Sequence, residues 1–97
     1  MQGAVNYGEL NDCSNKLKQI AEDMKDITNE VMNTINGVSN NGYWMGPAAE
    51  NYIKKSSDLK PIFNEGYIQI LGYAGALDDT IKRYQEIDKK ISSMMGF

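Results

Sequence analysis

The fold is decided by a stretch near the N-terminus, residues 10–38, which reads LNDCSNKLKQIAEDMKDITNEVMNTINGV. Its mostly apolar positions recur at alternating intervals of three and four residues. This spacing keeps one face of an α-helix apolar, whereas a β-strand would show an interval of two. The stretch therefore predicts a long amphipathic helix in which Cys13 is a buried packing residue. The seam consists of Leu10, Cys13, Leu17, Ile20, Met24, Ile27, Val31, Thr34 and Val38.

A second seam with the same alternation runs through the C-terminal half of the chain. Pro61 lies inside it, where it removes one helical hydrogen bond and disfavours helical geometry at Lys60. Because the register passes through Pro61 unbroken, we expect a kinked helix rather than a broken one. The positions are Tyr52, Ser56, Leu59, Phe63, Gly66, Ile70, Tyr73, Leu77, Thr80, Tyr84, Ile87, Ile91 and Met94.

Capping and turn residues mark the ends of the two helices. Asn6 followed by Glu9 has the spacing of a capping box. Gly37 favours the end of the first helix, because glycine tolerates the left-handed conformation found there. Pro47, directly after Gly46, suits the first position of the second helix. These signals predict one domain over residues 1–97, with a helix at about 7–36, a turn at about 37–46 and a helix at about 47–94.

The predicted fold is all-α, a two-helix antiparallel hairpin. Such a hairpin encloses no core of its own, so we expect two of them to pair into a four-helix bundle dimer. The middle of the second helix supports pairing, because Ile68 and Leu71 are apolar although they lie off the seam. Gly72 and Gly75 are poor helix formers that suit a close approach of another backbone. These four residues are the predicted dimer interface, in a homodimer or a heterodimer.

Composition argues against several functional classes. The net charge of −3 comes from interleaved acids and bases, without the basic cluster of a nucleic-acid-binding surface. Histidine is absent and there is one cysteine, so we expect no catalytic dyad, no metal site, no cofactor and no small-molecule substrate. The N-terminus shows no Sec-type signal peptide, and no apolar run is long enough to span a bilayer.

Two short motifs stand at separate places on the predicted hairpin. Trp44-Met45-Gly46 lies in the turn between the helices, and Tyr84 is followed by Asp88 one helical turn later. Asp88 has no basic residue three or four positions away, whereas nearby acidic residues have one, so it lacks a local structural role. Together these features resemble the WXG100 (ESAT-6-like) family, and the resemblance covers the whole chain.

The resemblance implies a folded helical-hairpin dimer exported by a type VII secretion system of a Gram-positive bacterium. Such a protein is cytoplasmic before export and extracellular afterwards, without a cleaved signal peptide. The implied export motif is Trp44, Gly46, Tyr84 and Asp88. In this family the turn tryptophan of one subunit lies near the Tyr-x-x-x-Asp/Glu segment of its partner, and the membrane ATPase of the system recognises both.

Three of the four motif residues also have a purely structural interpretation. Trp44 is large enough to plug the end of the hairpin, and Gly46 suits a positive φ angle before Pro47. Tyr84 occupies a seam position, which favours a packing role.

The functional prediction has three forms. The first is a small secreted effector or export component, not an enzyme. The second is a small helical partner of a larger LXG-type toxin, which completes the export signal of that toxin. The third, from another class, is a cytosolic helical adaptor or scaffold.

Overall fold

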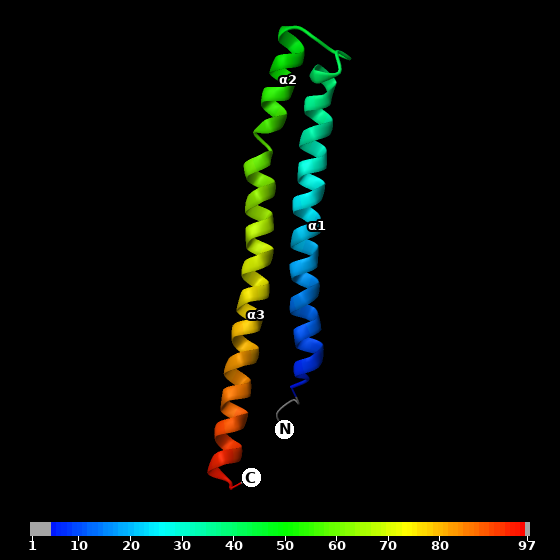
Figure 1. Cartoon of the computed structure of the whole chain (residues 1–97). Coiled ribbons are helices and arrows are strands. Elements are labelled where there is room, and N and C mark those ends of the chain that lie inside the picture. The colour runs from blue at the N-terminus through cyan, green and yellow to red at the C-terminus, as the bar shows by residue number, and fades with distance from the viewer. Residues whose placement is uncertain (1–4, 97) are drawn as a thin grey trace.

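The computed structural model describes residues 5–96 and contains three helices: α1 (Tyr7–Asn40), α2 (Pro47–Ser57) and α3 (Lys60–Met94). Helices α2 and α3 follow one another and form the second arm of an antiparallel hairpin (Figure 1). Helix α1 packs along α3 and, near the turn, against α2. The result is a rod of 76 × 21 × 17 Å. The predicted all-α hairpin is confirmed, while pairing into a bundle is not tested by a single chain. The N-terminal residues 1–4, which bear on the signal-peptide prediction, lie outside the described range.

The predicted cap at the start of α1 is confirmed. The side-chain oxygen of Asn6 accepts a hydrogen bond from the backbone N–H of Glu9 at 3.0 Å. This bond satisfies one of the N–H groups that have no partner within the first turn of a helix.

Helix α1 does not end near residue 36, as predicted, but continues to Asn40. Gly37 stays in the helix, and Gly42 takes the left-handed conformation at φ 70°. The N–H of Gly42 bonds the carbonyl of Ser39 at 2.9 Å, and the N–H of Tyr43 bonds the carbonyl of Val38 at 3.0 Å. These two bonds form a Schellman motif, which ends a helix with a glycine just beyond its last turn. The predicted helix end at Gly37 is therefore wrong, because Gly42 is the glycine that ends the helix.

The second arm is divided where a single kinked helix was expected. Helix α2 ends at Ser57, and the N–H groups of Asp58 and Leu59 bond carbonyls three residues back, at 3.3 and 3.1 Å. Pro61 has no N–H to donate, so the regular ladder cannot continue through this point. Asp58 and Leu59 nevertheless keep right-handed helical angles, and α3 continues the direction of α2 (Figure 1).

The contact between α1 and α3 is built from small side chains. Ala21 and Ala74 are fully buried, and Ser14 is 1% exposed. Small residues at these positions let two helices approach closely. The buried positions of α1 include 14, 21 and 28. Each lies one residue after a position of the predicted seam, namely 13, 20 and 27. The prediction that Cys13 is buried is wrong for the single chain, where its thiol is exposed.

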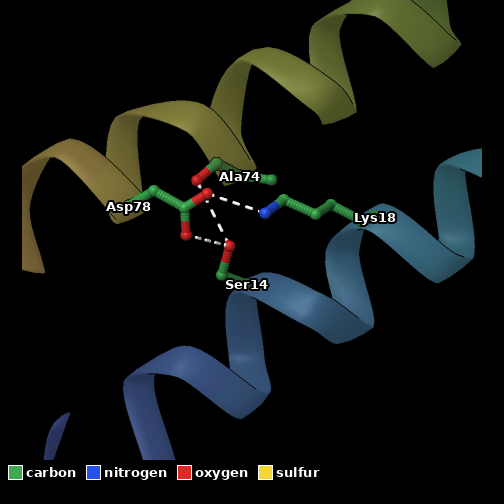
Figure 2. Close-up of polar contacts among 4 residues, drawn as sticks. All are labelled: Ser14, Lys18, Ala74 and Asp78. Carbon is green, nitrogen blue, oxygen red and sulfur yellow. Dashed lines mark hydrogen bonds and ion pairs between the residues drawn. The ribbon is translucent and has the colours of Figure 1, made fainter.

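A polar cluster fixes the alignment of the two arms (Figure 2). The buried hydroxyl of Ser14 contacts the Asp78 carboxylate and lies 3.4 Å from the carbonyl oxygen of Ala74. Lys18 Nζ lies 2.8 Å from Asp78 Oδ2. The hydrogen bond from Lys18, followed by that from Ser14, lowers the pKa of Asp78. These groups come from different helices. Sliding one helix along the other would therefore break the hydrogen bond between the Ser14 hydroxyl and the Asp78 carboxylate.

Candidate functional site

The turn end of the rod carries Trp44. Its backbone N–H donates to the carbonyl of Val38 at 3.2 Å, next to the bond from Tyr43. Its ring lies 5.6 Å from the ring of Tyr52 in α2, at an interplanar angle of 45°. The tryptophan remains 43% exposed. The indole therefore packs against the start of the second arm, as the plug interpretation expects, and still presents a large surface to solvent.

Gly46 connects the turn to α2. Its φ angle of 109° lies in a region that side-chain-bearing residues rarely adopt, and Pro47 follows as the first residue of the helix. The expected positive φ is confirmed. This conformation accounts for a glycine at position 46 without reference to any partner.

The second motif lies near the opposite end of the rod, on α3. Tyr84 is 48% exposed, so the packing role expected from its seam position is only partly met within one chain. Asp88 is exposed and accepts a hydrogen bond from the hydroxyl of Tyr7, the first residue of α1. This bond raises the pKa of Tyr7 to about 12.

The bond from Tyr7 gives Asp88 a structural partner on another helix, in addition to the local positions that the sequence argument considered. A search of positions three and four residues away could not find a partner on another helix. Tyr7 falls outside the first seam, whose alternation steps back four residues from Leu10 to Asn6, so the seam gave no signal for this contact.

The structure does not bring the four motif residues together within one chain. Trp44 and Gly46 lie in the turn between α1 and α2, whereas Tyr84 and Asp88 lie in the C-terminal part of α3, where Asp88 contacts the first residue of α1. The two pairs are thus separated along a rod whose long dimension is 76 Å. A site that contains all four needs a second molecule in antiparallel orientation.

The predicted interface residues occupy a separate part of α3. Ile68 is 63% exposed and Leu71 is half-buried. A Cβ atom placed on Gly72 or Gly75 would meet nothing within 4 Å. The surface is therefore open to a close approach, and its use as an interface stays a prediction.

A larger apolar surface, here called the outer face, follows the seam positions that the hairpin leaves uncovered. One groove on it, of about 490 Å³, is lined by residues of both arms, among them Cys13, Thr80 and Tyr84. A second hollow, of about 150 Å³, lies between Ile27 and Phe63. Positions seven residues apart share a helical face. The outer face therefore comprises Cys13, Ile20, Ile27 and Val31 of α1 and Phe63, Tyr73, Thr80, Tyr84 and Ile87 of α3.

Most of these side chains are large, apolar and substantially exposed. Ile27 is 58% exposed, Tyr73 66% and Ile87 50%. Exposed apolar side chains gathered on one face are typical of an interaction site.

Comparisons with protein-family models, with curated proteins and with solved structures found no match. None of the helices described between residues 5 and 96 has the length and apolar character needed to cross a membrane.

Proposed function

We propose that this protein is a WXG100-like substrate of a type VII secretion system, exported as a folded dimer. It acts as a small secreted effector or as a component that the export of other proteins requires. The observation that carries the proposal is the placement of Trp44 and Gly46 at one end of a helical hairpin and of Tyr84 and Asp88 toward the other. Antiparallel pairing of two such rods brings Trp44 of one copy close to Asp88 of the other at each end of the dimer.

The outer face supplies the surface for that pairing. Burying a large aliphatic or aromatic side chain stabilises an assembly by about 1.5–3 kcal/mol relative to leaving it exposed. Ile27, Tyr73 and Ile87 expose half or more of their surface in the single chain and would lose it in a four-helix bundle. A two-fold axis perpendicular to the rods relates two identical outer faces, makes the two rods antiparallel and gives a closed dimer.

The outer face also suits the helical N-terminal region of a larger LXG-type toxin. In that case the chain is a partner that completes the export signal of the toxin, and the assembly is a heterodimer. Purification separates the two forms: a chain that is stable alone as a dimer supports the homodimer. A chain that is insoluble without its neighbour supports the toxin partner.

The test is secretion by the native host. Culture supernatants are immunoblotted for wild type, Trp44→Ala and Asp88→Ala, in strains with and without the membrane ATPase, with a cytosolic marker to control for lysis. Wild type is expected outside only when the ATPase is present, and both variants are expected inside while still helical by circular dichroism.

Two matched substitutions control for general damage. Tyr43→Ala removes the neighbouring turn aromatic, which is 79% exposed, and Asp79→Ala removes another exposed carboxylate of α3. Both are expected to be exported like wild type. Retention of wild type in every strain contradicts the proposal and favours a cytosolic adaptor. Normal export of the Trp44 and Asp88 variants contradicts the assigned export motif.

A further inference from the structure

The first residue of α1 and the C-terminal part of α3 meet through a side-chain contact. Tyr7 is the first residue of α1, and its hydroxyl donates to Asp88 Oδ2 on α3, 81 positions away in the sequence. Tyr7 is half-buried and Asp88 is exposed. The contact closes the open end of the hairpin, where no loop joins the arms (Figure 1).

The hydrogen bond has a consequence for the carboxylate. An exposed aspartate without a partner samples several rotamers, whereas a bond to one oxygen restricts the side chain to an orientation that maintains it. Oδ2 is engaged by Tyr7, and no other hydrogen bond or ion pair involves Asp88 among residues 5–96. The other oxygen, Oδ1, therefore remains available in a fixed direction.

Tyr84 belongs to the same cluster. Tyr84 lines the same groove as Asn6 and Glu9, residues on either side of Tyr7 at the start of α1, and it lies one helical turn before Asp88 on α3. With a pKa of about 12, the Tyr7 hydroxyl keeps its proton, and so remains a donor, throughout the neutral range.

We propose that Tyr7 is a positioning residue of the export motif, which holds the Asp88 carboxylate beside Tyr84 when the first turn of α1 is docked on α3. The inference rests on the proposed function and extends it. A chain whose N-terminal turn has come away from α3 keeps the Tyr-x-x-x-Asp sequence but loses the fixed carboxylate. The export motif is thus complete only when α1 is docked on α3. Recognition of the motif by the secretion system therefore depends on the folded state of the hairpin.

The contact itself is tested with a double-mutant cycle. Thermal unfolding is measured for wild type, Tyr7→Phe, Asp88→Ala and the double variant. Because each substitution removes one partner of the same hydrogen bond, the effects on Tm are expected to be non-additive, with the double variant close to either single one. Strictly additive effects would overturn the proposal, because the two side chains would then act independently.

The role in export is tested in the secretion assay. Tyr7→Phe removes one oxygen atom and is expected to lower the exported fraction about fivefold, the factor that corresponds to one ordinary hydrogen bond. Tyr43→Phe is the matched control, since Tyr43 is 79% exposed in the turn, lies outside the outer face and makes no side-chain hydrogen bond within residues 5–96. It is expected to be exported like wild type.

A second control separates positioning from loss of stability. Ile81→Val shortens a side chain that is 4% exposed and leaves the polar groups of Tyr7, Tyr84 and Asp88 in place. Export is compared at a temperature at which Ile81→Val and Tyr7→Phe are equally folded. A defect shared by both variants overturns the positioning role, whereas a defect confined to Tyr7→Phe supports it.

The outcomes also distinguish this inference from the proposed function. If Asp88→Ala blocks export and Tyr7→Phe does not, the positioning role is wrong and the export motif stands. If wild type is retained in every strain and Asp88→Ala changes nothing, both the export motif and its positioning residue are rejected.

Discussion

Lys18 Nζ on α1 lies 2.8 Å from Asp78 Oδ2 on α3, and Ser14, one helical turn before Lys18, contacts the other oxygen of the same carboxylate. One carboxylate thus receives two donors from the opposite arm. Because the donors and the carboxylate belong to different arms, the cluster favours one register of the hairpin.

We predict that Asp78→Asn lowers Tm at neutral pH and that the difference from wild type disappears in acid. The folded-state pKa of Asp78 is lower than its ordinary value of 3.8. A carboxylate of this kind stabilises the fold above its unfolded pKa, and the contribution is lost as pH falls through the lower folded pKa. Thermal unfolding followed by circular dichroism between neutral pH and pH ~2 measures the effect. Asp79→Asn is the control, because its carboxylate is 65% exposed and pairs only with Arg83 at 3.4 Å. An equal loss in both variants contradicts the prediction.

The close helix contact predicts a strong position dependence for added bulk. Ala74→Leu places a large side chain at a fully buried position and is expected to cost about 1–3 kcal/mol in the free energy of unfolding. Ala76→Leu makes the same chemical change at an exposed position of α3 and is expected to stay within about 0.5 kcal/mol of wild type. Urea denaturation measures both. Similar values for the two variants would show that α1 and α3 do not approach closely at Ala74.

The helices and the hairpin were predictable from the sequence because the three–four alternation is sustained over both arms. The positions of α1 that face α3 were not predictable from the sequence. Cys13, Ile20 and Ile27 are more apolar than Ser14, Ala21 and Thr28, so periodicity alone favoured the first set. In the structure the second set is buried, because small side chains permit the close approach and leave the larger ones on the outer face.

The candidate site was predictable in part for a related reason. Short motifs identified Trp44, Gly46, Tyr84 and Asp88, and local chemistry predicted the positive φ of Gly46. The Tyr7 contact depends on the alignment of two helices separated by most of the chain. That alignment is fixed by tertiary contacts such as the Ser14–Asp78 pair, which no local pattern reveals.

The Schellman motif predicts opposite effects at two glycines. Gly42→Ala forces a side chain into the left-handed region and is expected to destabilise the protein by about 1–2 kcal/mol. Gly37→Ala lies inside α1 and is expected to stabilise it by up to about 1 kcal/mol. Its new Cβ would lie 3.2 Å from Asn41 Nδ2, an exposed side-chain atom that is free to move. Urea denaturation measures the change in the free energy of unfolding for both variants. Destabilisation by Gly37→Ala would indicate that the helix ends at Gly37.

The outer face and the surface around Ile68 make different predictions about assembly. Ile27→Glu places a charge on the outer face and is expected to convert a dimer into a monomer. Ile68→Glu places the same charge at a similarly exposed position, 63% against 58%, and is expected to leave the dimer intact. Sedimentation velocity at several concentrations measures the state of each variant. Dissociation by Ile68→Glu alone would assign the interface to the residues Ile68, Leu71, Gly72 and Gly75.

The raised pKa of Tyr7 predicts a loss of stability in strong base. The folded-state pKa is about 12, against an ordinary value of 10.0. Below pH 10 the contact contributes fully, and the contribution falls as pH rises through the folded pKa, because deprotonation removes the donor and places a negative charge beside Asp88. NMR of tyrosines labelled with ¹³C at Cζ should show one of the six titrating near 12, with helicity monitored at each pH. That signal should be absent in Tyr7→Phe and should move toward 10 in Asp88→Ala. Titration of all six tyrosines near 10 in a chain that is still helical would mean that the Tyr7 hydroxyl does not hold the carboxylate.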